Sequence, residues 1–174
     1  WNSQIFEHLI VKYGISDSEL CTTKVIASIR DLVISILGFL KNETGGERFV
    51  TSPQIILDFA SLFQYKITLG GTPVRAAIAM RKLGYTSALH LVTMNDHVRK
   101  LVPQDSPWVC SNDRESCYPH LIVQYCKDTC VQARDISIRT KQSNRMIYVN
   151  DNDNLLVKLN PELASLAAED RKST

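Results

Sequence analysis

Apolar residues recur at intervals of three and four along the first forty residues of the chain. Residues 3–13 and 17–41 both carry this spacing, which is typical of a helix that buries one face. Ser16 or Asp17 can cap the second helix, and Glu19 suits its first turn. The expected buried stripe consists of Leu20, Val25, Ile29, Leu32, Val33, Ile36, Leu37 and Leu40. We therefore predict two amphipathic helices at the start of the chain.

Helical and strand-like patterns alternate in the middle of the sequence. Residues 53–63 follow a proline that suits a first helical turn, and they carry a helical apolar face. Residues 65–69 and 88–94 read as strands, whereas residues 73–83 and 96–101 read as helices. Strands that alternate with helices indicate a parallel sheet covered by helices.

The character changes from residue 107 onward. The pieces PWVC, PHLIVQYC, ISIRT, RMIYVN and NLLVKL are short, strand-like and separated by turn residues, which favours an antiparallel meander. DNDN at residues 151–154 predicts a tight turn, and residues 161–170 predict a helix. We predict an α/β fold in three segments: a core portion with N-terminal helices at 1–106, a β-rich insert at 107–160, and a return helix at 161–174.

Composition excludes several classes of function. The chain has 174 residues, a net charge of +2 and a pI near 8.3, so nothing in its charge favours binding to nucleic acid or to a membrane. The apolar run at residues 25–40 is too short and too charged to span a bilayer. Five irregularly spaced cysteines form neither a disulfide framework nor a zinc knuckle, which favours reduced thiols and an intracellular protein. No G-x-S-x-G motif supports a hydrolase.

The stretch YKITLGGTPVRAAIAMRKLGY at residues 65–85 places Gly70 and Gly71 between a predicted strand and a predicted helix. Two interpretations stay open. The glycines can simply turn the chain and allow tight packing. They can also let a ligand approach free backbone N–H groups at the positive end of the helix dipole.

The segment GGTPVRAAIAMRKLG resembles the first signature of the ribokinase-like (PfkB-type) sugar kinases. Gly70, Gly71, Ala77, Leu83 and Gly84 occupy matching places. In that superfamily the segment lines the sugar site. The signature usually has Asn where this chain has Arg75, which implies either a changed acceptor specificity or a phosphorylated acceptor.

The order of segments from residue 40 to 170 is similar to that of the ADP-dependent glucokinases and phosphofructokinases. NETGGERFV places Glu47 where that branch has an acidic residue near the sugar, and HLIVQY through NRMIYVNDNDN resembles the strands of its lid. The resemblance implies an α/β ribokinase-like partial domain with a parallel sheet and a small antiparallel lid. It implies substrate contacts from Glu47, Gly70, Gly71, Thr72, Arg75, Asn144 and Arg145.

This kinase group transfers phosphate with the Asp of a Gly-x-Gly-Asp turn, and the sequence contains no such turn. We therefore expect the chain to be the N-terminal, acceptor-binding portion of a kinase, inactive by itself, with no catalytic residue or metal site of its own and with the nucleotide bound mainly by the missing half. Mg²⁺ and ADP or ATP are implied for the complete parent protein, which we expect in the cytoplasm. The chain also starts at Trp1 rather than Met.

A second hypothesis is a non-catalytic relative that binds a small ligand or forms a homodimer through its β insert. The histidines do not decide between the two. His120 at a strand start favours a local hydrogen bond over a catalytic role, and His90 and His97 have similar structural explanations. Arg75 fits anion binding and a solvated helix face equally well, and Asn144 fits a solvated turn.

Overall fold

The structure is a computed structural model that describes residues 1–112, 115–151 and 158–170. Contacts within the chain divide it into two compact units. Unit 1 comprises Trp1–Tyr65 and Tyr118–Asp151, and unit 2 comprises Lys66–Cys117 and Asn152–Thr174. These boundaries differ from those of the three predicted segments, whose assignment as domains stays a prediction.

The helices of unit 1 begin and end close to their sequence signals, with one exception. Helix α1 spans Ser3–Tyr13, as predicted, and α3 spans Pro53–Ala60, with Ser52 capping its first turn. The predicted single helix over residues 17–41 is wrong. It is divided into a 3-10 turn, Asp17–Glu19, and helix α2, Ile29–Lys41.

The division has a local cause. The side chain of Ser28 accepts a hydrogen bond from the backbone N–H of Asp31 and so caps the start of α2. Just before this cap, Ile26 forms a parallel bridge to Val50, which holds the chain in an extended conformation.

Five residues of the predicted stripe are buried in α2: Leu32, Val33, Ile36, Leu37 and Leu40. Ile29 is half-buried and Val25, before the helix, is 72% exposed, so the prediction for Val25 is wrong. The residues between them in α2 are buried too, so this helix is buried on every side from Leu32 to Leu40.

A three-stranded sheet crosses unit 1 in the order β1-β7-β4. Strand β1, Gly46–Phe49, pairs in parallel with β7, Asn144–Val149, which pairs antiparallel with β4, Leu121–Tyr125. Strands β5, Cys130–Ala133, and β6, Ile136–Arg139, form a separate antiparallel hairpin. The sequence predicted β4, β6 and β7 but missed β1 and β5.

One buried threonine joins the two ladders. The hydroxyl of Thr140 donates to the carbonyl of Cys126 at 2.7 Å and accepts from the N–H of Thr129 at 3.0 Å. The expected meander is therefore a single long hairpin, Leu121–Val149, bent at Thr140.

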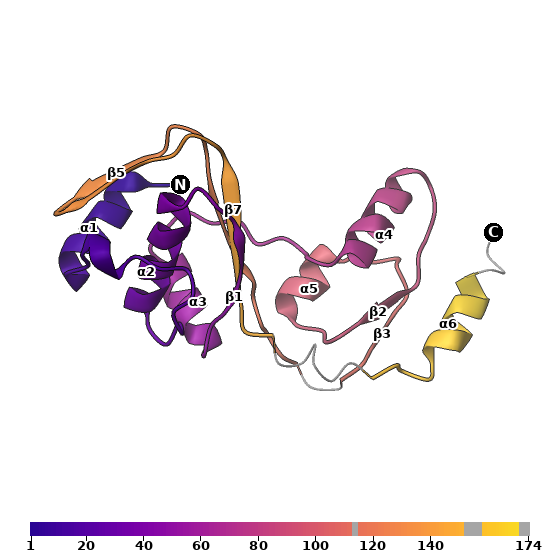
Figure 1. Ribbon diagram of the computed structural model, residues 1–174. Coiled ribbons are helices and arrows are strands. Elements are labelled where there is room, and N and C mark those ends of the chain that lie inside the picture. The colour runs from indigo at the N-terminus through magenta and orange to yellow at the C-terminus, as the bar shows by residue number, and fades with distance from the viewer. Residues whose placement is uncertain (113–114, 152–157, 171–174) are drawn as a thin grey trace. The chain divides into compact units, whose positions relative to one another are not determined.

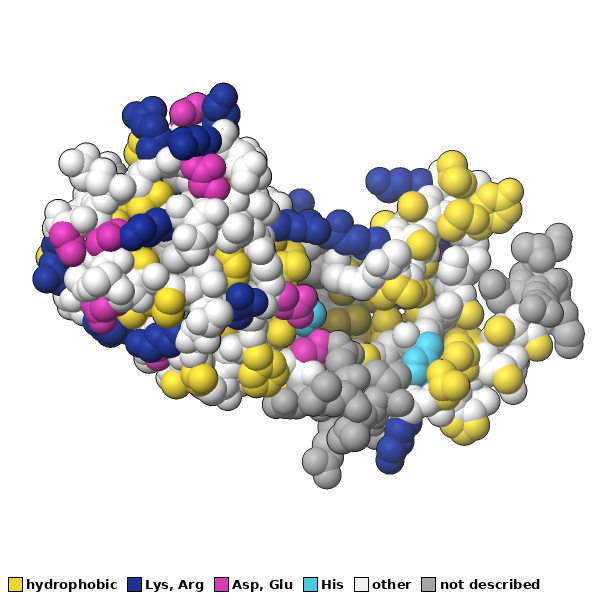
Figure 2. Space-filling model, viewed as in Figure 1, with side chains coloured by type: hydrophobic (Ala, Val, Ile, Leu, Met, Phe, Trp, Pro, Cys, Tyr) yellow, Lys and Arg dark blue, Asp and Glu magenta, His cyan; other side chains and the backbone are white. Residues whose placement is uncertain are grey.

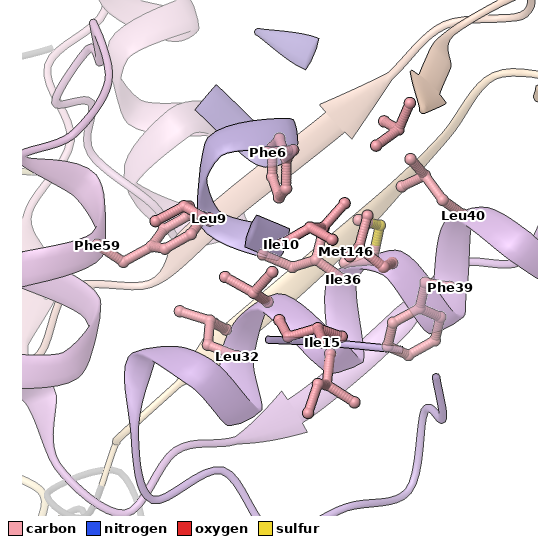
Figure 3. Packing of buried hydrophobic residues seen from close by; sticks show 14 of the residues in the cluster. Phe6, Leu9, Ile10, Ile15, Leu32, Ile36, Phe39, Leu40, Phe59 and Met146 are labelled. Carbon is pink, nitrogen blue, oxygen red and sulfur yellow. The ribbon is translucent and has the colours of Figure 1, made fainter. Parts of the chain in front are cut away.

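Helices α1, α2 and α3 lie on the same side of β1 and β7 (Figure 1). Their apolar faces meet the sheet in the main core, part of which is shown in Figure 3. Within this core, Ser35 of α2 and Tyr148 of β7 are fully buried and their hydroxyls lie 3.0 Å apart. The helices thus cover one face of the sheet, and the other face is available to form a site.

Unit 2 is a small parallel α/β arrangement. Helix α4, Thr72–Lys82, precedes β2, Leu89–Leu91, and α5, Asp96–Leu101, precedes β3, Trp108–Cys110. Strands β2 and β3 are parallel, as an alternation of strands and helices predicts, and α6 spans Leu163–Asp170. The hydrophobic core of unit 2 is small and includes Ala77, Leu89, Leu91, Met94 and Val102.

Two predicted strands differ from the structure, and one predicted turn lies largely outside the described residues. The strand predicted at residues 65–69 is wrong, because those residues have no ladder partner in the described chain. PWVC does form a strand, but it pairs in parallel with β2 rather than within an antiparallel insert. The turn predicted at residues 151–154 and the strand after it fall largely outside the described residues. The whole chain is a mixed α/β structure.

Candidate functional site

The uncovered face of the β1-β7-β4 sheet follows from the alternation of side chains along each strand. On β7, Met146 and Tyr148 point into the core, so Arg145 and Ile147 point to the opposite face. On β1, the guanidinium of Arg48 lies over the Phe39 ring of α2, 5.0 Å from its centroid. Its neighbours along β1 therefore point away from the helices. We call this second face the open face.

The registers bring side chains from three strands together on the open face. Glu47 lies beside Ile147, which lies opposite Ile122 of β4. Arg145 lies opposite Gln124 in the next row. Directly paired antiparallel residues have Cβ atoms about 4.5–5.5 Å apart, so Arg145 and Gln124 can bind one ligand together.

A histidine and a carboxylate lie at the other end of this face. His120, just before β4, has its Nε2 atom 3.0 Å from Oδ2 of Asp151, just after β7. His120 therefore bonds to a carboxylate 31 residues further along the chain, rather than making the local hydrogen bond that its position at a strand start predicted. Because Asp151 holds one ring nitrogen, the orientation of the imidazole is fixed at the edge of the open face.

The predicted lid residues Asn144 and Arg145 point to opposite faces of the sheet. Arg145 is exposed on the open face with Glu47. The side-chain oxygen of Asn144 accepts a hydrogen bond from the N–H of Arg145 at 2.9 Å. It also lies where a Cβ atom on Gly45 would be. Asn144 therefore shapes the start of β7 beside the chain that enters β1.

The other predicted residues form the turn before α4 in unit 2. Gly71 caps this helix with φ 80°, a left-handed value that favours glycine. Nothing lies within 4 Å of a Cβ built on Gly70, so the turn is open. Nε of Arg75 donates to the carbonyl of Leu69 at 3.3 Å, which ties the helix back to the chain before the turn. Thr72 is the first residue of α4.

The seven predicted residues thus form two sets. Glu47, Asn144 and Arg145 belong to unit 1, and Gly70, Gly71, Thr72 and Arg75 belong to unit 2. Sequence reasoning missed four further residues that the open face presents: Phe49, Ile122, Gln124 and Ile147. The alternation of residues 120, 122 and 124 was the available signal for part of this face.

Burial controls the ionisation of the tyrosine at the end of β4. Loss of water around the Tyr125 hydroxyl raises its pKa, and the nearby charge of Glu43 raises that pKa further. The neutral phenol donates to the carbonyl of Thr44 at 3.1 Å. This bond connects β4 to the chain that enters β1, and so fixes both outer strands of the open face.

The other charged side chains of the described chain form neither a metal site nor a patch of one sign in the view of Figure 2. Positive and negative side chains are mixed on the face shown in Figure 2. Within the described residues, no group of three or more His, Cys, Asp or Glu side chains could hold a metal ion. Nor does any helix in that part of the chain have the length and apolar character needed to cross a membrane.

Comparison with known families gives a match along almost the whole sequence. Residues 4–170 match the ADP-specific phosphofructokinase/glucokinase conserved region. The chain belongs to this family. The resemblance inferred from the glycine signature and the order of segments is therefore confirmed. The family is one of ADP-dependent sugar kinases, as the resemblance implied.

Two solved structures show the same fold as this chain. One is a hypothetical ADP-dependent phosphofructokinase from Pyrococcus horikoshii OT3, with 16% identity and a TM-score of 0.65 over 86% of this chain and 37% of that chain. The other is a phosphofructokinase from the same organism with AMP, with 15% identity and a TM-score of 0.69 over 100% of this chain and 43% of that chain. The chain thus spans less than half the length of either protein. Curated protein sequences give no match.

Proposed function

We propose that this chain supplies the acceptor-binding side and lid of a sugar or sugar-phosphate kinase. The open face carries the proposal, because it gathers a carboxylate, a guanidinium, an amide and an oriented imidazole beside exposed apolar side chains. A face of this composition suits a polyhydroxylated ligand. Membership of an ADP-specific kinase family supports phosphoryl transfer by the parent protein.

Each proposed contact has a distinct chemical role. The Glu47 carboxylate accepts hydrogen bonds from sugar hydroxyls, and the Arg145 guanidinium donates to hydroxyl or phosphate oxygens. Gly70, Gly71 and Thr72 offer backbone groups at the start of α4, where the helix dipole favours an anion or a polarised oxygen. Nε of Arg75 donates to the carbonyl of Leu69, and its two terminal nitrogens can donate to a phosphate on the acceptor.

The nucleotide and the metal belong to the parent protein in this proposal. ADP is the donor that the family implies, with Mg²⁺ to neutralise its phosphates. We assign neither group to a residue of this chain, because its sequence carries no motif for either. The side-chain oxygen of Asn144 accepts the N–H of Arg145, and its contact with the acceptor stays a prediction.

The complete natural protein tests this function. We expect transfer of phosphate from ADP to glucose or fructose 6-phosphate, and an intact mass at least twice that of this chain, which is 19.6 kDa. The substitutions Glu47→Gln and Arg145→Gln should raise the KM for the acceptor about tenfold or more, whereas Asp58→Asn on the exposed side of α3 should leave it unchanged. Absence of transfer to either acceptor would refute the proposal and favour the non-catalytic relative.

Location and assembly are part of the same proposal. We place the protein in the cytoplasm and expect a homodimer formed through the β insert at residues 107–160. Strand β6 supports this assembly, because within the described residues it pairs only with β5. The outer edge of β5 is already occupied, since Ser3 donates to the carbonyl of Cys130 and the N–H of Gln132 donates to Glu7. A monomeric mass in sedimentation equilibrium of the complete protein would contradict it.

A further inference from the structure

Helix α2 ends in a left-handed residue that is not glycine. Glu43 has φ 55°, and the N–H groups of Glu43 and of the next residue donate to carbonyls in the last turn of α2, both at 3.1 Å. Many helices end in this way, and the left-handed position is usually occupied by glycine. Helices α1 and α4 follow that preference, with Gly14 and Gly84. Glu43 therefore keeps a side chain where the backbone favours a residue without one.

The carboxylate of Glu43 is bound to the long hairpin rather than to its own helix. Oε1 of Glu43 accepts a hydrogen bond from the backbone N–H of Lys141 at 3.2 Å. The backbone carbonyl of Glu43 accepts a second one from Nε2 of Gln142 at 2.7 Å. Both partners lie between β6 and β7, directly after the bend at Thr140. Two successive residues of the hairpin thus hold one residue at the end of α2.

The two residues that follow contact the same hairpin. The carbonyl of Thr44 accepts a hydrogen bond from the hydroxyl of Tyr125 at 3.1 Å. A Cβ atom on Gly45 would collide with the side chain of Asn144 and with the carbonyl of the residue after it. The backbone of Gly45 therefore packs directly on the start of β7. We call residues 43–45 the latch.

The latch determines where β1 begins along β7. Strand β1 has four residues and starts directly after the latch, with Gly46 beside Met146. Glu47 is the next residue of β1, and Arg145 lies at the hairpin end of the same contacts. A displacement of about 1 Å in a binding group can cost about a hundredfold in rate. Small shifts of the latch therefore reach both charged groups of the open face.

We propose that Glu43 is a positioning residue, whose carboxylate fixes the start of β1 through its bond to Lys141. It thereby sets the separation between Glu47 and Arg145. Glu43 itself does not contact the acceptor. A left-handed conformation is costly for a residue with a side chain, and the contact with the hairpin offsets that cost. This inference rests on the proposed function, in which Glu47 and Arg145 bind the acceptor, and adds a residue outside the binding face.

The test separates position from stability in variants of the complete natural protein. Glu43→Gly should raise the KM for glucose or fructose 6-phosphate about tenfold, because Glu47 is no longer held in place. The urea midpoint should change little, since the backbone gain of glycine at φ 55° offsets the lost hydrogen bond. The KM for ADP should not change.

Three further variants show which contact matters. The amide oxygen of Glu43→Gln can still accept from Lys141, so its acceptor KM should stay within about twofold of the natural value. Gln142→Ala removes the donor to the carbonyl of Glu43 and should raise the acceptor KM about threefold or more. Asp128→Gly is the matched control, because Asp128 has φ 63° on the same hairpin and its side chain pairs with Arg139 at the surface. Its acceptor KM should not change.

Hydrogen exchange gives a readout that does not depend on the acceptor. In Glu43→Gly the amides of β1, Gly46–Phe49, should exchange faster, whereas those of α1 should not change. Unchanged exchange in β1 would overturn the proposal. So would an unchanged acceptor KM in Glu43→Gly, and if Glu47→Gln raises that KM, the proposed function still stands.

If Glu43→Gly does not fold, Gln142→Ala decides, and an unchanged acceptor KM in that variant overturns the proposal. If neither glucose nor fructose 6-phosphate accepts phosphate in the natural protein, the proposed function falls and this inference falls with it.

Discussion

Replacing Gly38 with alanine gives a test in which local propensity and packing predict opposite signs. Gly38 lies inside α2, where alanine normally stabilises a helix by about 1 kcal/mol relative to glycine. The structure leaves no room for the added methyl group. A Cβ atom on Gly38 would lie 2.7, 2.8 and 2.9 Å from the C, O and N atoms of Cys21. We therefore expect Gly38→Ala to destabilise unit 1.

The magnitude follows from the type of atoms in contact. Carbon atoms pack best at about 3.5–4.0 Å, so α2 or the chain at Cys21 must move by about 1 Å. These are backbone atoms, which cannot rotate away as a side chain can. Overpacking of a core costs about 1–3 kcal/mol, and the upper end applies here. After subtraction of the propensity gain, we expect the free energy of unfolding to fall by about 2 kcal/mol.

Urea unfolding can follow unit 1 separately. The chain has two tryptophans, and Trp1 stacks on Phe6 of the main core with ring centroids 4.1 Å apart. In a Trp108→Phe background, fluorescence therefore reports unit 1 alone. Val11→Ala on the exposed face of α1 controls for the helix propensity of alanine and should be neutral or slightly stabilising. A higher urea midpoint for Gly38→Ala would refute the packing argument.

Two further predictions concern buried and exposed polar groups of unit 1. Ser35→Ala should lower the free energy of unfolding by about 1–3 kcal/mol, because it leaves the buried hydroxyl of Tyr148 without its partner. In a double-mutant cycle, Ser35→Ala with Tyr148→Phe should cost less than the sum of the single changes, and strict additivity would contradict a direct bond. The hydrogen bond from Arg30 is the main cause that lowers the pKa of Glu19 to about 2. The folded state therefore favours the ionised carboxylate of Glu19, and the urea midpoint should fall as the pH is lowered from 4.5 toward 2. The midpoint should fall less steeply in Glu19→Gln. Equal slopes in the two proteins would refute this linkage.

Local patterns were sufficient for elements whose signals lie within a few residues. The spacing of apolar residues predicted α1, and the helix predicted at residues 96–101 is α5, whose first N–H groups Asn95 caps. The same reasoning joined residues 17–41 into one helix, because an apolar period continues through residues 20–28. It could not weigh the bridge between Ile26 and Val50, a tertiary contact that extends the chain there.

Strand β1 was missed for a similar reason. GGERF begins with two glycines and contains two charges, so it lacks the composition of an isolated strand. It forms because β7 offers a parallel partner whose residues lie 100 positions further along the chain, with Gly46 beside Met146. Long-range pairing of this kind leaves no mark in a short window of sequence.

The same long-range pairing explains why the candidate site was only partly predictable. The Gly70–Gly71 turn can be recognised from the local sequence, because the positive φ of Gly71 favours glycine. The open face has no such local mark, since Glu47 acquires Ile147 and Ile122 as neighbours only when three strands align. A glycine signature can therefore indicate the family, whereas the residues proposed to surround the acceptor depend on strand register. A one-residue shift of β7 would turn Arg145 and Ile147 into the core and Met146 onto the open face, so the main core itself fixes the chemistry of the site.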